Sequence, residues 1–223
     1  MFERTASLHA EKSSAGELER SNMGQVNIAV LVSGGGTNLQ ALLDAERSGK
    51  LVSGRITLVV SDRSGAYALE RAKSAGVRAL EINRKACGSQ AVFEERLEAA
   101  LRESGAELII LAGFLNLLSA DFTRRWDHRI LNVHPSLIPS FCGAGYYGLK
   151  VHEAALARGV RLTGATVHFV NEIPDGGEIL LQKAVAVQPG DTPEILQRRV
   201  MEEAEWILLP QAAEEVSRRL LRD

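Results

Sequence analysis

Cysteine is scarce in this sequence and shows no metal-like spacing. Only two of the 223 residues are cysteines, Cys87 and Cys142, and they lie far apart in the chain. A disulfide framework and a cysteine-based metal site are therefore not expected. The pattern is typical of two reduced thiols in a cytoplasmic protein, and no metal is predicted.

The sequence also lacks an excess of charge of one sign and any long hydrophobic run. The formal net charge is −2, with 26 Lys and Arg against 28 Asp and Glu. A broad nucleic-acid surface needs clustered basic residues, so no nucleic-acid partner is expected. Backbone amides can still hold one phosphate group. No apolar stretch approaches the roughly 18 residues of a membrane helix, so no membrane partner is expected.

The N-terminal residues differ in composition from the rest of the chain. The first 22 carry charges throughout and lack the apolar segment of a secretory signal. We predict a flexible extension over residues 1–24, whose role the sequence leaves open, and a single domain over residues 25–223. That length is ample for one domain and short for two.

Short apolar runs alternate with amphipathic segments in the first half of the domain. Strands are predicted at 26–32, 56–60, 77–82, 107–112 and 129–133. Helices are predicted between them, around Leu39 to Leu43 and over 66–75, 90–104 and 119–126. This order predicts an α/β fold with a Rossmann-like open, mostly parallel sheet and helices on both faces.

The pattern changes after residue 135. An irregular loop rich in proline and glycine leads to a predicted helix at 151–158. The strand-like runs 163–170 and 179–187 then predict an antiparallel C-terminal addition to the sheet. A last helix is expected from Thr192, with Pro193 in a tolerated position and Pro210 breaking or kinking it.

A glycine-rich turn follows the first predicted strand. Gly34, Gly35 and Gly36 precede Thr37 and Asn38 at the start of a helix. Glycine permits a tight turn and a close ligand approach, and the free amides of a helix N-terminus attract anions. The spacing matches neither the dinucleotide-binding nor the Walker A motif. The turn is interpreted as a phosphate site, with a ligand-free tight turn as the alternative.

Asn132 and His134 lie at the end of the fifth predicted strand. Side chains two residues apart on a strand share a face, and open α/β sheets bind ligands at the carboxyl ends of their strands. An amide beside an imidazole suits the stabilisation of an oxyanion and the transfer of a proton. The alternative is a buried pair whose hydrogen bonds are satisfied by nearby loops.

Asp175 precedes Gly176 and Gly177 in the turn between the two late strands. Asp-Gly is a common turn pair, so turn formation alone is one explanation. A loop here can also fold over the sheet edge, where a carboxylate would orient His134 and favour its protonated form. The candidate catalytic residues are therefore Asn132, His134 and Asp175. His168, in a predicted strand, is assigned a structural role.

Three stretches in this order resemble the folate-dependent formyltransferases: Ser33-Gly34-Gly35-Gly36-Thr37-Asn38, Asn132-Val133-His134-Pro135-Ser136-Leu137 and Asp175-Gly176-Gly177. The likeness covers about residues 25 to 215. The second and third stretches are shared by the transferases and hydrolases of this family. The turn ending in Thr37-Asn38 resembles the phosphoribosylglycinamide formyltransferase branch more narrowly.

This resemblance implies a reaction in purine biosynthesis. The formyl group of the co-substrate 10-formyltetrahydrofolate would pass to the amine of 5′-phosphoribosylglycinamide, which gives formylglycinamide ribonucleotide and tetrahydrofolate. The implied partners are these small molecules, without a metal. The oligomeric state is left open between monomer and homodimer.

The resemblance also implies roles for further residues. Gly36, Thr37 and Asn38 would hold the 5′-phosphate, and Glu205 the ribose hydroxyls, with Glu203 as the fallback. The folate would be enclosed by a lid loop at 171–175 and by a second set of residues: Leu115, Asn116, Leu117, Leu118 and Asn132.

Two departures from the family pattern stand out. A basic residue that often contacts the folate in this family falls at Gln90. Gln90 is therefore predicted to bind the folate, but the acidic tail of the folate would be held more loosely or by another group. The loop at 141–149 is longer than in the shorter family members, which leaves that wall of the site undefined.

Three other functions compete with this prediction. A formyltetrahydrofolate hydrolase would use the same three residues with water as acceptor, without a phosphate site and usually with an additional N-terminal domain. A non-catalytic nucleotide-binding module would use only the glycine-rich turn, which leaves Asn132, His134 and Asp175 unexplained as a set. A transfer-RNA-directed enzyme would need a basic appendage, and the net charge argues against it.

Overall fold

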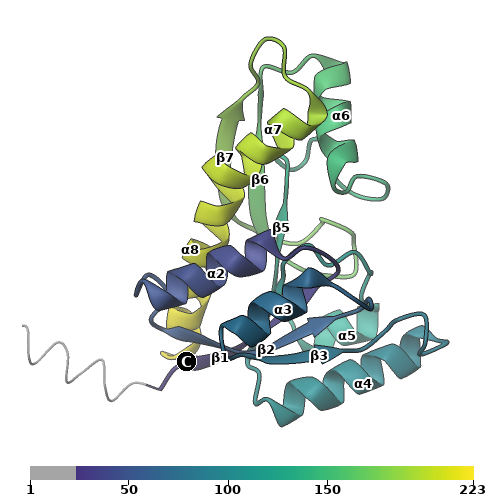
Figure 1. Cartoon of the computed structure of the whole chain (residues 1–223), viewed down its shortest axis with the longest axis vertical. Helices are drawn as coiled ribbons and strands as arrows, with labels where there is room; N and C mark the ends of the chain where they lie inside the picture. Colours follow the sequence, from purple (N-terminus) through teal and green to yellow (C-terminus); the bar gives the residue numbers. More distant parts are fainter. Residues whose placement is uncertain (1–23) are drawn as a thin grey trace, which may run out of the picture.

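One seven-stranded sheet carries the fold, with the strand order β3-β2-β1-β4-β5-β6-β7 (Figure 1). The structure, a computed structural model, describes residues 24–223. The predicted extension lies outside the described residues except for Gly24, so its boundary with the domain stays a prediction.

The first five strands are mutually parallel and the last two are antiparallel. Their bounds are β1 Val26–Val32, β2 Gly54–Ser61, β3 Arg78–Glu81, β4 Leu108–Leu111, β5 Ile130–His134, β6 Leu162–Phe169 and β7 Ile179–Ala186. The predicted Rossmann-like sheet with an antiparallel C-terminal addition is confirmed, with strand ends within two residues of those expected.

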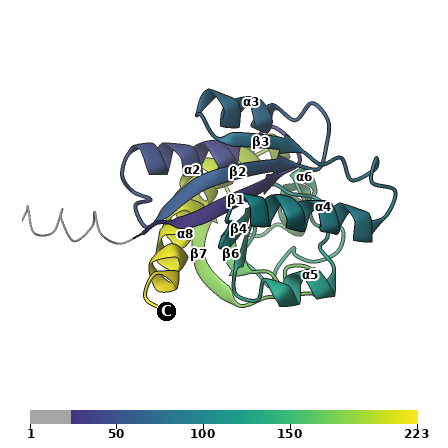
Figure 2. The same ribbon diagram turned by 90° about the horizontal axis from the view of Figure 1, so that it is seen from below.

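Helices cover both faces of the sheet (Figure 2). One face carries α2 Thr37–Arg47, α3 Tyr67–Ser74 and α8 Trp206–Leu220, and the other carries α4 Gln90–Glu103 and α5 Ala120–Arg125. The helices α6 Leu149–Arg158 and α7 Pro193–Val200 contact each other near the antiparallel strands (Figure 1). Within residues 24–223, no helix is both long and apolar enough to cross a membrane.

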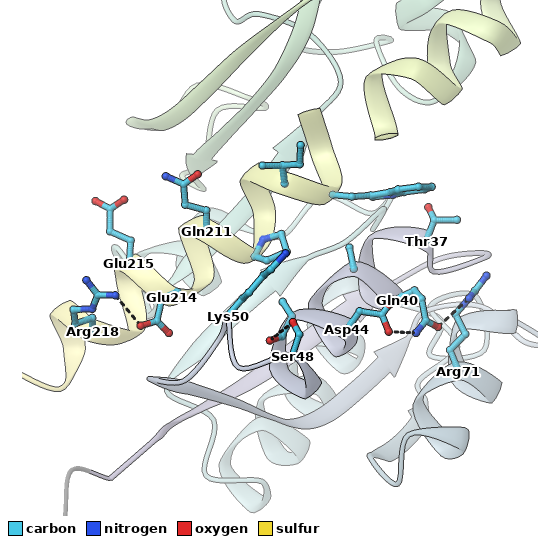
Figure 3. A pocket seen from close by; sticks show the side chains of 15 residues that line it. Thr37, Gln40, Asp44, Ser48, Lys50, Arg71, Gln211, Glu214, Glu215 and Arg218 are labelled. Carbon is cyan, nitrogen blue, oxygen red and sulfur yellow. Dashed lines mark hydrogen bonds and ion pairs between the residues drawn. The ribbon is translucent and has the colours of Figure 1, made fainter. Parts of the chain in front are cut away.

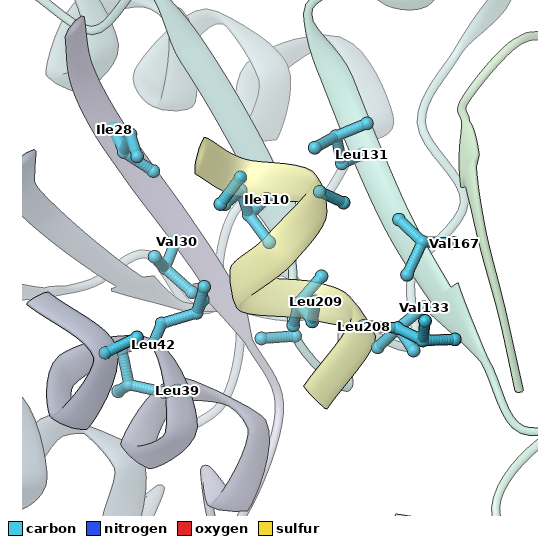
Figure 4. Close-up of a cluster of buried hydrophobic side chains, with 14 of the residues drawn as sticks. Ile28, Val30, Leu39, Leu42, Ile110, Leu131, Val133, Val167, Leu208 and Leu209 are labelled. Carbon is cyan, nitrogen blue, oxygen red and sulfur yellow. The ribbon is translucent and has the colours of Figure 1, made fainter. Parts of the chain in front are cut away.

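The alternation of β1 explains why two cores form. Ile28 and Val30 face the core beneath α2 and α8, whereas Ala29 and Leu31 face the core beneath α4 and α5. Successive side chains of a strand point to opposite faces, so a strand covered on both sides is apolar at every position. Figure 4 shows α8 crossing the sheet, with Leu208 and Leu209 among the strand side chains.

Pro210 lies inside α8 and does not end it, so the expectation of a helix break there is wrong. The irregularity lies five to nine residues earlier, where Met201–Glu205 form a π-helical turn between α7 and α8. Proline has no N–H to donate, and its ring crowds the preceding turn. A widened turn is one of the recognised ways in which a helix accommodates such a disruption.

The strand order reverses between β1 and β4. From β1 the chain adds β2 and β3 on one side, and from β4 it adds β5 on the other. Open α/β sheets bind ligands at the carboxyl ends of the strands where this reversal occurs. Here Ser33, after β1, donates its backbone N–H to the Gly113 carbonyl, after β4, at 3.1 Å. The fold therefore joins the glycine-rich turn to residues 113–118 at this edge.

Gly164→Ala is expected to destabilise the sheet between β6 and β7. A Cβ atom at this position would lie 2.0 Å from the Lys183 carbonyl oxygen and 2.9 Å from Leu137 Cδ2. Because the backbone has to move, we expect the free energy of unfolding to fall by about 1–3 kcal/mol. Urea denaturation followed by circular dichroism measures it.

Gly24→Ala is the matched control, since a Cβ atom there would meet nothing within 4 Å. Equal stability of the two variants would contradict the proposed close approach of β6 and β7.

Candidate active site

A cavity of about 550 Å³ lies at the carboxyl ends of β4 and β5, beside Asn38 in the first turn of α2. Its walls come from the loops after β4, β5 and β6, together with α6, α7 and the π-helical turn. Nine of the predicted site residues line this one cavity: Asn38, Leu115, Asn116, Leu117, Leu118, Asn132, His134, Asp175 and Glu205. The tertiary structure thus brings together residues that are up to 167 positions apart.

His134 lies between two hydrogen-bond acceptors. Its Nε2 is 2.8 Å from the Phe141 carbonyl oxygen, and its Nδ1 is 3.5 Å from Asp175 Oδ2. The ring is almost fully buried. The expected approach of Asp175 to His134 is confirmed.

Asp175 is held by groups from three directions. Its Oδ2 accepts the backbone N–H of Gly143 at 2.8 Å, and its Oδ1 lies 3.6 Å from His168 Nε2. Burial alone raises the pKa of this carboxyl group, but the contacts with His168, His134 and Gly143 outweigh it and leave the pKa below its ordinary value. The carboxylate is therefore ionised beside His134.

A close approach of Gly177 to the Phe169 backbone fixes the direction of the Asp175 loop. A Cβ atom at Gly177 would lie 1.8 Å from the Phe169 carbonyl oxygen, so only glycine fits there. Asp175 itself has φ 55°, a conformation that aspartate adopts more readily than most residues. The Asp-Gly-Gly stretch therefore both makes the turn and directs the carboxylate inward.

Asn132 and His168 face each other across the antiparallel pair of β5 and β6. Asn132 Nδ2 is 3.1 Å from His168 Nε2, and His168 Nδ1 is 2.7 Å from the Phe169 carbonyl oxygen. The structure thus places His168, assigned only a structural role from the sequence, in the cavity beside two candidate catalytic residues. The missed signal is the register of two strands that are distant in sequence.

The glycine-rich turn leads into a helix without a side-chain cap. Gly36 has φ 73° at the N-cap of α2, and no side chain accepts a hydrogen bond from the first turn. The helices α3 and α6 also begin without a side-chain cap, whereas α4, α5 and α7 are capped by the hydroxyl groups of Ser89, Ser119 and Thr192. The first amides of α2 thus remain available, as an anion site requires.

Glu205 lies at the same end of the cavity, in the π-helical turn. Asn38 Nδ2 donates to its Oε2 at 2.7 Å. Burial raises the pKa of Glu205 to about 7, and the hydrogen bond from Asn38 lowers it only in part. The fallback Glu203 is exposed and does not line the cavity.

Apolar side chains form the opposite end of the cavity. Leu115 and Leu117 are 47% and 69% exposed, and Ile173 of the facing loop is 58% exposed. Leu115 is fixed through its backbone N–H, which donates to Ser33 Oγ at 2.9 Å. Large apolar groups that remain exposed around a concave site are typical of a surface for an apolar ring system.

Gln90 does not line this cavity. Its Nε2 donates to the Leu117 carbonyl at 3.1 Å, and its Oε1 accepts from Arg84 Nε at 3.0 Å. It therefore supports the apolar wall from behind, and direct contact with a folate stays a prediction.

A protein-family model described as formyl transferase matches residues 26–212. The chain belongs to the formyl transferase family. The match covers the glycine-rich turn, the Asn132 and His134 strand, the Asp175 loop and the turn with Glu205, so the predicted resemblance is confirmed.

Individual relatives agree with this formyl transferase assignment. The chain is 44% identical over 193 residues to the trifunctional purine biosynthetic protein adenosine-3 of Gallus gallus, covering 86% of this chain and only 18% of that protein. It is 40% identical to phosphoribosylglycinamide formyltransferase of Haemophilus influenzae, over 79% of this chain and 80% of that one. Glycinamide ribonucleotide transformylase 1 from Symbiobacterium toebii superposes with a TM-score of 0.81 at 43% identity, covering 87% and 89% of the two chains.

His152 is a further residue of the formyl transferase cavity that sequence patterns did not indicate. It lies on α6, is fully buried, and neither ring nitrogen has a hydrogen-bond partner within residues 24–223. Burial, together with the nearby His134, lowers the pKa of His152 to about 4. The ring is therefore neutral at physiological pH, and unlike His134 and His168 it has no carboxylate beside it in the cavity.

A second hollow of about 1000 Å³ lies between α2 and α8 on this formyl transferase (Figure 3). Charged side chains of both signs line it, among them Lys50, Arg71 and Glu214, and Thr37 is its only predicted site residue. None of the candidate catalytic residues reaches it. Within residues 24–223, no three His, Cys, Asp or Glu side chains form a group suited to a metal ion.

Glu205→Gln is expected to stabilise the protein at alkaline pH and not at acidic pH. The pKa of Glu205 rises from an ordinary 4.5 to about 7 on folding. Above its ordinary pKa the unfolded chain releases the proton while the folded chain retains it, so folding stability falls as the pH rises through this window. At about 1.4 kcal/mol for each pKa unit, the loss is about 3 kcal/mol.

Denaturant unfolding of both proteins at about pH 4.5 and about pH 8 measures the difference. Glutamine keeps an oxygen acceptor for Asn38, and the exposed Glu203→Gln serves as control. The same stability difference at both pH values would contradict the buried, titrating carboxyl group.

Proposed function

We propose that this formyl transferase transfers the formyl group of 10-formyltetrahydrofolate to the amine of 5′-phosphoribosylglycinamide. One observation carries the proposal: Asn132, His134 and Asp175 converge in a single cavity between an uncapped helix N-terminus and an apolar wall. The product pair would be formylglycinamide ribonucleotide and tetrahydrofolate.

The two ends of the cavity suit two different substrates. The phosphate of the ribonucleotide would bind the amides of Gly36, Thr37 and Asn38, and its ribose hydroxyls would bind Glu205. The pterin of the folate would lie along Leu115 to Leu118 and the loop at 171–175. The reacting amine and formyl carbon then meet beside Asn132 and His134, at the junction of both walls.

The chemistry follows from the donors at that junction. When the amine attacks the formyl carbon, its oxygen becomes an oxyanion, which the Asn132 amide and the protonated His134 stabilise. The bond from that carbon to the folate nitrogen then breaks, and His134 supplies the proton that this nitrogen needs. The attacking amine loses a proton, which Asp175 accepts through water and returns to the imidazole.

The geometry requires one exchange of partners before this step. His134 Nε2 is engaged by the Phe141 carbonyl, and Nδ1 faces Asp175. Nε2 therefore has to leave Phe141 to reach the substrate. Phe141 has φ 50°, an uncommon conformation for a bulky residue, so a shift of this turn also relieves backbone strain.

A hydrolase is the main rival, with water as the acceptor in place of the amine. The candidate catalytic residues lie in the same cavity as Glu205 and close to the uncapped turn of α2. This arrangement favours a phosphorylated ribose substrate, which a hydrolase does not need. A binding module without catalytic activity would not explain the contact between His134 and Asp175.

His134→Ala, Asn132→Ala and Asp175→Asn are each expected to lower kcat at least about 100-fold. An oxyanion donor contributes roughly 10² to 10³ in rate, and acid–base assistance roughly 10² to 10⁴. Absorbance of 10-formyl-5,8-dideazafolate, with and without glycinamide ribonucleotide, measures turnover.

Turnover that depends on the ribonucleotide supports the transferase, and turnover without it identifies a hydrolase. His128→Ala is the control, because His128 lies outside the cavity beside Asp127 and Glu178. Near-normal kcat in the His134→Ala variant would overturn the assignment.

Gly36→Ala tests the phosphate site separately. A Cβ atom there would lie 2.6 Å from Ala68 Cβ and would require a side chain at φ 73°, so the start of α2 has to shift. We expect the KM for the ribonucleotide to rise at least about tenfold while the KM for the folate stays the same, since one charge-assisted contact contributes about 1.5–3 kcal/mol.

The adjacent Gly35→Ala is the control, because a Cβ atom there would meet nothing within 4 Å. If both variants raise the KM equally, or if Gly36→Ala changes the folate KM instead, the phosphate does not bind at this turn.

A further inference from the structure

The proposed role of Asn132 requires one particular orientation of its carboxamide. The amide nitrogen donates hydrogen bonds, whereas the amide oxygen only accepts them. If the group were rotated by half a turn, the oxygen would face the developing oxyanion and repel it. A neighbouring group therefore has to fix which end of Asn132 faces the substrate.

We propose that His168 is the positioning residue that fixes this orientation, with a proton on Nδ1 and with Nε2 facing the Asn132 amide nitrogen. The inference rests on the proposed function, because it concerns the oxyanion donor of that reaction. His168 does not itself touch the reacting atoms.

The tautomer of His168 follows from its backbone neighbour. Nδ1 lies 2.7 Å from the Phe169 carbonyl oxygen, which can only accept, so Nδ1 carries the proton. In a neutral ring, Nε2 is then an acceptor. Asn132 Nδ2, at 3.1 Å, is the group that can donate to it.

Among residues 24–223, Asp175 is the charged group that lies beside Nε2 and competes with Asn132 for it. Its Oδ1 lies 3.6 Å from Nε2, farther than Asn132 Nδ2 at 3.1 Å, and its Oδ2 accepts the Gly143 amide at 2.8 Å. The His168 ring is 1% exposed, so solvent does not readily replace either of its partners. Nε2 therefore pairs with Asn132.

The strand register keeps this pair together. Asn132 is directly opposite His168 in the antiparallel pairing of β5 with β6. Directly opposed side chains on one face of a sheet have Cβ atoms about 5 Å apart, so the backbone itself sets their contact. One hydrogen of Asn132 Nδ2 is then committed to His168, and the second remains for the substrate.

The kinetic test compares His168→Leu in two backgrounds. Leucine fills much of the space but offers no acceptor, so the Asn132 amide is free to turn. We expect kcat to fall about 10- to 100-fold, within the effect of losing one oxyanion donor, with both KM values unchanged. In the Asn132→Ala background, the same substitution should change kcat less than about twofold, because no amide remains to be oriented.

Two further variants complete the kinetic test. His168→Gln supplies a side-chain oxygen acceptor and should restore part of kcat. His128→Leu replaces an exposed histidine outside the cavity and should leave kcat unchanged. An equal loss of kcat in both backgrounds would show that His168 is merely structural and would overturn the proposal.

The second readout needs neither activity nor a substitution at His168. Nitrogen-15 spectra of histidine-labelled wild-type protein at neutral pH should show His168 protonated on Nδ1 alone, and Asn132→Ala should shift its Nε2 resonance. A proton on Nε2, or an Nε2 resonance unaffected by Asn132→Ala, would overturn the proposal. If the wild-type protein does not formylate the ribonucleotide, the proposed function fails, while these spectra still decide the pairing of His168 with Asn132.

Discussion

The antiparallel pairing of β5 with β6 is the constraint on which the cavity depends. It sets Asn132 opposite His168 and His134 opposite Thr166, so the polar side chains of two strands share one face. The chain then leaves β6 after Phe169 and returns to β7 through a loop that Gly177 holds close to the Phe169 carbonyl. Because that loop is anchored at its base, the Asp175 carboxylate reaches both histidines.

The charges in the cavity are divided between its two ends. Asp175 has two imidazoles and a backbone amide as neighbours, which keep it ionised despite burial. Glu205 has a single neutral donor, so burial prevails and its pKa rises to about 7. The two carboxyl groups thus differ in protonation for two reasons: Asp175 is only partly buried and has several hydrogen-bond donors as neighbours, whereas Glu205 is buried and has a single neutral donor.

The turn from Phe141 to Gly143 contacts both members of the central pair. The Phe141 carbonyl accepts a hydrogen bond from His134 Nε2, and the Gly143 amide donates one to Asp175 Oδ2. This loop therefore forms part of the wall of the candidate site. It also connects this wall to α6, on which the neutral His152 is buried against the same cavity.

Local sequence patterns determined the strands, most of the helices and the shared face of Asn132 and His134, because these depend on side-chain period and on nearby glycine and proline. They also identified Asp175 as a candidate. Only the tertiary structure decided that His168 and His152 join the cavity, that Gln90 stands behind its wall, and that the helix continues through Pro210. The reason is physical: strand register, burial and the pKa of a buried group arise from contacts between residues distant in sequence, and no local pattern encodes them.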